Sequence, residues 1–292
     1  MSVLKWDVSK IVGLTASQTS AGGRPYNQDT CDIATVGRKC GVAAVYDGHG
    51  EYGQQCAEFV RDRMRAELRQ AHAPKGSRSD ALSNAFVDTH TALVKGDGTP
   101  PGTQSDLSGS TASVAWLWED ELMVGHVGDS GVVVVRREPD TAKLTASQVT
   151  VNHHPDVEGE RARIEARGGR VDQKYGKGPF RLYQANLLLP GLMVSRSLGD
   201  SVAHAAGASA EPDVLSYGPD PNLAAIVLAS DGLWDTVKPD TVADIVSHHS
   251  APKAACEALM AMAATGHSMD NITVVVSYLY TTAGGRRWCC CG

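Results

Sequence analysis

Long hydrophobic stretches and an excess of basic residues are both missing from this sequence of 292 residues. Its apolar runs, such as residues 131–135 and 272–276, are strand-sized and far shorter than the ~20 residues of a membrane-spanning helix. Lysine and arginine number 27 against 33 aspartates and glutamates, which gives a net charge of −6. Nucleic-acid-binding proteins usually carry a basic surface, so this balance argues against nucleic acid as a partner.

Cysteine pairs at metal-binding or redox spacing are also absent. Of seven cysteines, four are dispersed and three are consecutive at positions 289–291, and none forms a Cys-x-x-Cys pair. Such a set is typical of reduced thiols, so we expect an intracellular, cytoplasmic protein. Residues 1–6 lack the apolar stretch of a secretory signal, and Ser2 excludes N-myristoylation.

The motifs of several common nucleophilic enzymes are missing as well. There is no Gly-x-Ser-x-Gly turn, no phosphate-binding Gly-x-x-x-x-Gly-Lys-Ser/Thr loop, and no cysteine followed six positions later by arginine. The Gly-Asp-Ser-Gly at 128–131 resembles the nucleophile block of chymotrypsin-like peptidases. Four valines follow it, however, and no Ala-Ala-His-Cys block lies upstream to supply a base.

Hydrophobic periodicity predicts paired helices and short strands. Helical spacing covers 56–68, 82–93, 242–246 and 255–263, and strand-like runs cover 41–46, 224–229 and 272–279. Three more strand-like runs, 111–118, 122–127 and 131–136, are joined by turn-sized links, which predicts an antiparallel meander. This order favours an α+β layered domain over a doubly wound parallel sheet. The Gly-rich segment around 168–192 is predicted to be an irregular insertion beside the active site.

Five aspartates lie at the ends of predicted strands: Asp29, Asp47, Asp129, Asp231 and Asp270. Any one of them alone is explained equally well by the chemistry of turns. Five carboxylates gathered at one edge would repel one another, and divalent cations would make such a cluster tolerable. Ligation by oxygen alone indicates a hard ion such as Mg²⁺ or Mn²⁺, and no His-Glu-x-x-His motif offers a zinc alternative.

Eight short blocks in order carry a family resemblance. They are Arg24-Pro-Tyr-Asn-Gln-Asp29, Val45-Tyr-Asp-Gly-His-Gly50, Ser108-Gly-Ser-Thr-Ala112, Val127-Gly-Asp-Ser130, Val194-Ser-Arg-Ser-Leu-Gly-Asp200, Glu211-Pro-Asp213, Ala229-Ser-Asp-Gly-Leu-Trp-Asp235 and Asp270-Asn-Ile-Thr273. With these blocks the sequence resembles the metal-dependent serine/threonine protein phosphatases of the protein phosphatase 2C family. The resemblance implies a four-layer α-β-β-α sandwich, with two antiparallel sheets flanked by antiparallel helix pairs.

The resemblance also implies a centre of two Mg²⁺ or Mn²⁺ ions. Asp47 would bridge both ions, Asp231 and Asp270 would hold one of them, and Gln28 with the Gly48 carbonyl would reach the other. Asp129 with Asp231 would form a weaker third site. Asp29 and Asp200 resemble accessory acids that hold metal-bound waters.

The implied reaction is in-line hydrolysis of phosphoserine or phosphothreonine by a metal-bridging water, without a phosphoenzyme intermediate. Arg24 can bind two phosphate oxygens as a fork. His49 is the candidate acid for the leaving alkoxide, although a lone histidine in a turn is more often structural. Thr111 either orders a metal-bound water or is a plain strand hydroxyl.

Two positions depart from the family pattern. Position 28 is Gln where many relatives carry Glu, which supplies a carbonyl without a charge. Position 131 is Gly where the family usually has Arg, and we expect little effect on catalysis. Some family members have lost metal ligands and act as regulatory phosphoprotein-binding modules. Gln28 is the feature that favours this alternative.

The predicted catalytic domain spans residues 10–280, with residues 281–292 as a flexible tail. The tail ends in Arg-Arg-Trp-Cys-Cys-Cys-Gly, and acylated cysteines beside basic residues would anchor the protein to a membrane surface. An unmodified tail with reactive thiols is the alternative, and the sequence leaves both open. We expect a monomer that acts on phosphorylated proteins.

Overall fold

Two antiparallel sheets lie face to face in the computed structural model, which describes residues 4–37, 39–71 and 74–282. The first sheet has the strand order β1 (Thr15–Ser20), β15 (Ile272–Tyr278), β14 (Leu223–Ala229), β7 (Gly131–Arg137) and β8 (Leu144–Gln148). The second has the order β12 (Leu198–Gly199), β4 (Gly109–Ser110), β3 (Cys40–His49), β5 (Ala112–Trp118), β6 (Leu122–Val127) and β13 (Asp213–Tyr217), and β2 (Asp29–Gly37) pairs with β3.

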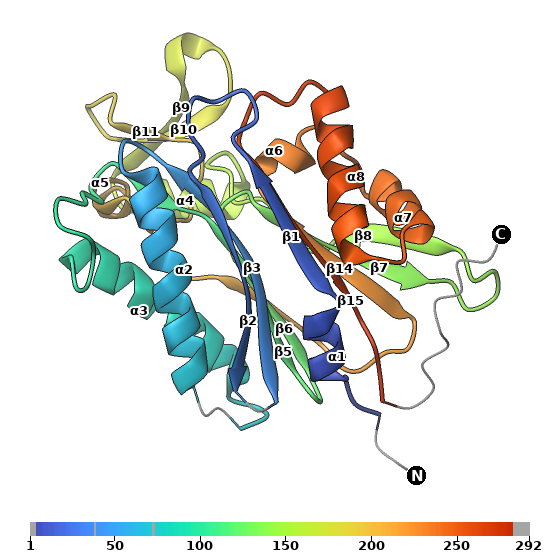
Figure 1. The fold of residues 1–292 in the computed structure, drawn as a ribbon. Helices are drawn as coiled ribbons and strands as arrows, with labels where there is room; N and C mark the ends of the chain where they lie inside the picture. The colour runs from blue at the N-terminus through green and yellow to red at the C-terminus, as the bar shows by residue number, and fades with distance from the viewer. Residues whose placement is uncertain (1–3, 38, 72–73, 283–292) are drawn as a thin grey trace.

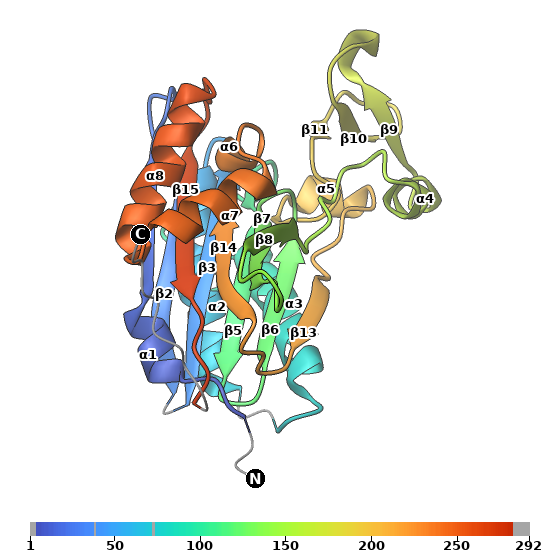
Figure 2. The ribbon, with the colours of Figure 1, turned by 90° about the vertical axis from the view of Figure 1, so that its right-hand side faces the viewer.

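Helix pairs cover the outer faces of both sheets, as Figures 1 and 2 show. Helices α2 (Gly53–Gln70) and α3 (Arg78–Lys95) pack on the second sheet, and α7 (Pro239–His248) and α8 (Pro252–Thr265) pack on the first. A third apolar cluster fills the space between the sheets, with α1 (Val8–Gly13) at its edge. The predicted four-layer α-β-β-α sandwich is therefore confirmed.

The helix predictions are confirmed by which residues are buried. In α2 the buried side chains include Cys56, Val60, Met64 and Leu68, a spacing of four that keeps them on one face. Helix α3 is followed by its C-cap residue Gly96, whose φ of 74° lies in the left-handed region that favours glycine. Helices α7 and α8 both begin with proline in the first turn, where its missing N–H has no intrahelical partner to lose.

The predicted meander is wrong in its third strand. β5 and β6 pair as expected, but β7 pairs with β14 and β8 in the other sheet, and β13 occupies the free edge of β6. All six residues of β6 and the first five of β7 are buried, because each strand is covered on both faces. A continuous run of apolar residues predicts a strand, but it does not show which other strand will pair with it. As a result, residues 128–130 cross from one sheet to the other.

The insertion at 168–192 is also more regular than predicted. It forms a small antiparallel sheet of β9 (Gly169–Gln173), β10 (Phe180–Gln184) and β11 (Pro190–Leu192), with a short η1 turn (Lys174–Gly176). Together with α4 (Glu158–Ala166) and α5 (Ser201–Ala205), this sheet projects beyond one end of the sandwich (Figure 2). Ile164, Val171, Leu182 and Ala203 form its own apolar core. We call residues 158–206 the flap.

The packed core extends beyond the predicted domain limits of 10 and 280. Trp6 is buried and forms a β-bridge with Thr281.

Among the described residues, no helix is both long and apolar enough to cross a membrane. The four cysteines in the described part of the chain, Cys31, Cys40, Cys56 and Cys256, are free thiols. The three tail cysteines lie outside the described residues, so their acylation stays a prediction.

Candidate active site

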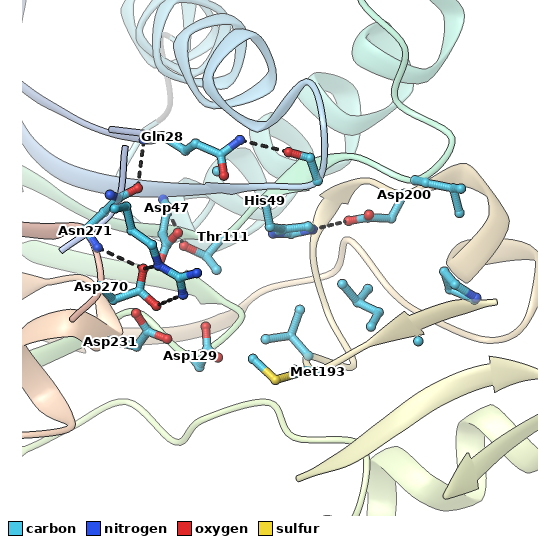
Figure 3. A pocket seen from close by; sticks show the side chains of 18 of the residues that line it. Gln28, Asp47, His49, Thr111, Asp129, Met193, Asp200, Asp231, Asp270 and Asn271 are labelled. Atoms are coloured by element: carbon cyan, nitrogen blue, oxygen red, sulfur yellow. Dashed lines mark hydrogen bonds and ion pairs between the residues drawn. The ribbon is translucent and has the colours of Figure 1, made fainter. Parts of the chain in front are cut away.

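A cleft of about 600 Å³ opens where the two sheets and the flap meet (Figure 3). Ten of the eleven residues that the sequence singled out line this cleft: Arg24, Gln28, Asp47, Gly48, His49, Thr111, Asp129, Asp200, Asp231 and Asp270. Asp29 is the exception. It is buried behind the cleft wall, where the Ser230 hydroxyl donates to its Oδ2 at 2.7 Å.

Both sheets deliver carboxylates to this end of the sandwich. Asp47 lies near the end of β3 in the second sheet, and Asp129 lies at the crossing from β6 to β7. Asp231 follows β14 and begins the short helix α6 (Asp231–Trp234), while Asp270 precedes β15 in the first sheet. Residues from four separate stretches of the chain therefore face one cavity, as their positions at strand ends predicted.

Glycines allow the chain segments to approach closely here. A Cβ on Gly48 would lie 2.2 Å from the Gly53 carbonyl oxygen and 2.7 Å from the Gln28 carbonyl oxygen. Gly50 has a φ of +83°, and a Cβ there would lie 2.3 Å from the Leu107 carbonyl oxygen. Other residues at 48 and 50 would force these segments apart, so close packing requires both glycines of the Asp-Gly-His-Gly motif.

Crowding raises the pKa values of the carboxyl groups. Burial raises the pKa of Asp47 well above its usual value, and Asp29, Asp231, Asp129 and Asp270 raise it further. The pKa of Asp231 is raised to about 7, mainly by burial and then by the charges of Asp129 and Asp270. In both cases loss of hydration and repulsion between like charges disfavour the ionised carboxylate. The site is therefore electrostatically unfavourable unless protons or cations reduce its charge.

The donor set fits a hard divalent cation, because it consists of carboxylate oxygens with the carbonyl oxygens of Gln28 and Gly48 nearby. An assembled coordination sphere is not seen. Within the described residues, no three His, Cys, Asp or Glu side chains converge closely enough to hold an ion. One reason is that Asp270 accepts two hydrogen bonds from Arg24, at 3.0 Å from Nε and 2.6 Å from Nη2.

Gln28 is anchored by both its backbone and its side chain. Its Nε2 donates to the Gly50 carbonyl at 2.8 Å, and its backbone N–H donates to the Asn271 side-chain oxygen at 2.8 Å. The Gly48 N–H in turn donates to the Gln28 carbonyl at 3.2 Å. The amide of Gln28 thus holds the 48–50 turn in place. A glutamate could not make the same donation to Gly50.

Thr111 connects Asp47 to the neighbouring strand crossing. The Asp47 N–H donates to Thr111 Oγ1 at 3.1 Å, and the same hydroxyl bonds Ser130 Oγ at 2.6 Å. The hydroxyl is therefore used within the protein, which favours the plain structural interpretation of Thr111 over a water-ordering one.

His49 is paired with Asp200. Its Nε2 lies 2.7 Å from Asp200 Oδ2, and Asp200 is almost completely buried. Burial lowers the pKa of His49, but the charge and hydrogen bond of Asp200 raise it more, so the net shift is upward. The expected role of Asp200 in holding a metal-bound water stays a prediction, and the structure shows its carboxylate in contact with the candidate acid.

Sequence reasoning gave no role to several other groups at the site. Asn271 fastens the 21–28 segment beside β15 with three hydrogen bonds, because its Oδ1 accepts from Gln28 and its Nδ2 donates to the Ala21 and Tyr26 carbonyls. Asp235 has its pKa raised by burial and then by Asp270. Both residues stand inside blocks that carried the family resemblance, so their positions in those blocks were the available signal. The flap residues Arg181 and Met193, which also line the cleft, had no such signal.

Gly131 lies against Trp234, whose indole N–H donates to the Gly131 carbonyl at 3.2 Å. A Cβ at this position would lie 3.1 Å from Trp234 Nε1. The indole therefore occupies the space into which a larger side chain would extend.

Comparisons with known proteins identify the family of this chain. The sequence matches the family Protein phosphatase 2C over residues 27–272. It is 32% identical over 251 residues to "Probable protein phosphatase 2C 59" of Arabidopsis thaliana, which covers 85% of this chain and 73% of that protein. It is 31% identical over 293 residues to "Probable protein phosphatase 2C 45" of Oryza sativa subsp. japonica, covering 96% of this chain and 95% of that protein.

The fold also matches a solved structure. The serine-threonine phosphatase 2C of Toxoplasma gondii superposes with a TM-score of 0.78 at 22% identity, and the match covers 96% of both chains. The fold is therefore that of a protein phosphatase 2C structure, and its cleft is lined by carboxylates. The chain belongs to the protein phosphatase 2C family and is by class a serine/threonine protein phosphatase.

Charge crowding at Asp231 predicts how the metal-free protein responds to pH. The pKa of Asp231 is about 7 in the folded state, against ~3.9 for an unfolded aspartate. Between these values the folded protein holds a proton that the unfolded protein lacks, so this group lowers the free energy of unfolding as pH rises. Asp231→Asn should remove this decrease in the free energy of unfolding. The variant should therefore be more stable than the metal-free wild type at neutral pH, by about 1.4 kcal/mol per unit of pKa shift.

Urea unfolding in EDTA at acidic and neutral pH, followed by circular dichroism, measures this effect. Asp140→Asn is the matched control, because Asp140 is an exposed aspartate in a loop outside the cleft. Parallel pH profiles for wild type and Asp231→Asn would contradict the prediction.

Proposed function

We propose that this protein hydrolyses phosphoserine and phosphothreonine in proteins by direct in-line attack of a water, without a phosphoenzyme intermediate. The observation that carries the proposal is the single cleft in which Asp47, Asp231 and Asp270 face Arg24 and His49. Among the described residues that line the cleft there is no cysteine and no serine, and the aliphatic hydroxyl of Thr111 is bonded within the protein. Water is therefore the better candidate nucleophile.

The proposed cofactors are two Mg²⁺ or Mn²⁺ ions with a weaker third. Asp47 would contact both ions, Asp231 and Asp270 one of them, and Gln28 with the Gly48 carbonyl the other. Asp129 with Asp231 would provide the third site. Bound ions would offset the charge of the carboxylates and lower the pKa of a water. The raised pKa values of Asp47 and Asp231 support this assignment, since such groups are stabilised by cations.

Arg24 and His49 would act on the phosphoryl group and the leaving group. Arg24 donates through Nε and Nη2 in a fork, which matches two phosphate oxygens as well as it matches the carboxylate of Asp270. As the new bond from water oxygen to phosphorus forms, the bond to the serine or threonine oxygen breaks. His49 would then give its proton to that oxygen, so that the alcohol leaves in neutral form.

The alternative function is a regulatory module that binds phosphoproteins without hydrolysing them. Gln28 favours it, because the amide brings no charge to the metal site and is bonded to Gly50. The retained carboxylates, Arg24 and His49 favour the enzyme.

We expect Mn²⁺-dependent release of phosphate from a phosphothreonine peptide. Asp47→Asn and Asp231→Asn should each lower kcat/KM by about 100-fold or more, because each removes charge that stabilises the transition state. Asp140→Asn should leave the rate unchanged. If the wild type binds the peptide in millimolar Mn²⁺ but releases no phosphate, the regulatory module is the correct interpretation.

Replacing Gln28 by glutamate should change metal dependence and stability in opposite directions. Gln28→Glu adds a charged oxygen donor, so the Mn²⁺ concentration for half-maximal activity should fall. The loss of the bond to Gly50 and the added charge should destabilise the metal-free protein by about 1 kcal/mol. The rate of peptide dephosphorylation at increasing Mn²⁺ concentrations and urea unfolding in EDTA measure the two effects. Gln28→Ala removes the bond without adding charge, and an unchanged or higher Mn²⁺ requirement in Gln28→Glu would be the contrary result.

We also propose that the tail cysteines are acylated and bring this otherwise cytoplasmic protein to a membrane surface. The support is their sequence alone, three adjacent cysteines that follow Arg286, Arg287 and Trp288. The intact mass of protein purified from cells should exceed the sequence mass by one or more acyl groups. A mass equal to that of the unmodified chain would exclude the anchor.

A further inference from the structure

We propose that Asp200 is a positioning residue for His49, and that it acts through the imidazole ring and not through a metal-bound water. The inference rests on the proposed function, because it concerns how the acid for the leaving group is presented. His49 Nε2 lies 2.7 Å from Asp200 Oδ2. Among the described residues none bonds the other ring nitrogen, Nδ1, which is therefore the atom available to the leaving group.

The position of Asp200 separates it from the carboxylate cluster. Figure 3 shows Asp200 on one side of His49 and the labelled Asp47, Asp231 and Asp270 on the other. Asp200 contacts the imidazole of His49 directly, with 2.7 Å between its Oδ2 and Nε2 of the ring.

The backbone of Asp200 is held in a conformation that is uncommon for non-glycine residues. Its φ and ψ are both 49°, in the left-handed region, which costs a non-glycine residue on the order of 1 kcal/mol. Its N–H donates to the Ser108 carbonyl at 3.0 Å, and its carbonyl accepts from the His204 N–H at 3.0 Å. The surrounding hydrogen bonds thus maintain a locally unfavourable backbone, which directs the side chain toward His49.

The carboxylate itself is confined as tightly as the backbone. Ser197 Oγ donates to the same Oδ2 at 2.6 Å, so that oxygen is shared between one hydroxyl and His49. A Cβ on Gly109 would lie 2.2 Å from this oxygen, so a side chain at 109 would displace the carboxylate. The carboxylate has little freedom to turn, and neither does the imidazole bonded to it.

A second pair of histidines supports this arrangement from behind. The His90 and His204 rings stack with centroids 3.9 Å apart. His90 Nδ1 accepts from the N–H of Gly199, the residue before Asp200, at 3.2 Å, and His204 Nε2 lies 3.0 Å from the Ser197 carbonyl. Burial is the main cause that lowers the pKa of both His90 and His204. Neutral rings of this kind are structural supports that add no charge next to Asp200.

The pairing gives His49 a defined role for each nitrogen. Nε2–H remains bonded to Asp200, and Nδ1–H gives its proton to the serine or threonine oxygen as the phosphorus–oxygen bond breaks. The electron pair of that bond forms the new O–H bond, and the neutral imidazole keeps its proton on Nε2. It later regains a proton on Nδ1 from solvent. A negative partner at Nε2 both selects this tautomer and stabilises the charged ring before transfer.

The test compares two substrates that differ in their need for an acid. A phosphothreonine peptide releases an alkoxide that requires a proton, whereas p-nitrophenyl phosphate releases a stabilised phenolate that does not. With saturating Mn²⁺, Asp200→Asn should lower kcat for the peptide about 10- to 100-fold and change kcat for p-nitrophenyl phosphate less than about threefold. KM for the peptide should stay within about twofold, because His49 acts on the leaving group and not on binding.

Three further measurements distinguish positioning from other roles. In the His49→Gln background, Asp200→Asn should cause no additional loss, since the two residues act as one unit. The calorimetric affinity for Mn²⁺ should be unchanged in Asp200→Asn. Asp213→Asn is the matched control, because it removes the carboxylate partner of another buried histidine, His153, at 3.2 Å, and it should leave the ratio of the two substrate rates unchanged.

The outcomes separate this proposal from the proposed function. A wild-type protein that hydrolyses neither substrate overturns both. An active wild type in which Asp200→Asn slows both substrates equally, or slows neither, overturns only the role of Asp200. Weaker Mn²⁺ binding in Asp200→Asn would show that the residue acts through the metal site, as the family resemblance first implied.

Discussion

Mutual repulsion among buried carboxylates is the constraint on which this structure depends. Burial removes the water that would screen Asp47, Asp129 and Asp231, and their pKa values rise in consequence. A cluster of this kind is maintained only by a scaffold that is stable for other reasons. Two apolar sheets with helices on both outer faces provide that stability, and the acidic end of the sandwich contributes function at a cost in free energy.

Polar contacts around the cluster organise it without neutralising it. Thr111 bonds both Asp47 and Ser130, Gln28 bonds the 48–50 turn, and Asn271 holds the 21–28 segment beside β15. Each of these groups is uncharged, so it fixes geometry and leaves the negative potential in place. Arg24 is different, because it is a cation that shares the cleft and pairs with Asp270. Its side chain and that of Asp270 are both substantially exposed, so the pair is weak and can exchange partners.

Much of this could be predicted from the sequence, for identifiable reasons. Strand ends and Asp-Gly turns located the carboxylates correctly, because sheets bring the ends of distant strands together. The helix pairs followed from apolar spacing. The sheet to which β7 belongs could not be predicted, because a strand buried on both faces carries no pattern that names its neighbour. The flap sheet was missed for the opposite reason, since its short strands are only partly buried and alternate weakly. The contact of Asp200 with His49 spans 151 residues, and no local pattern encodes it.

The register of β1 with β15 also fixes where the rest of the chain can be attached. The pair runs from Ser20 opposite Ile272, beside the cleft, to Thr15 opposite Ser277, a length of about 20 Å. Beyond Thr15 the chain reaches Trp6, which bridges Thr281. Both ends of the described chain therefore leave the molecule together, at the end of the sandwich away from the cleft (Figure 1). Any attachment at either end, such as a tether or a bound surface, would therefore contact the end of the sandwich opposite the cleft. The cleft would stay accessible to a substrate.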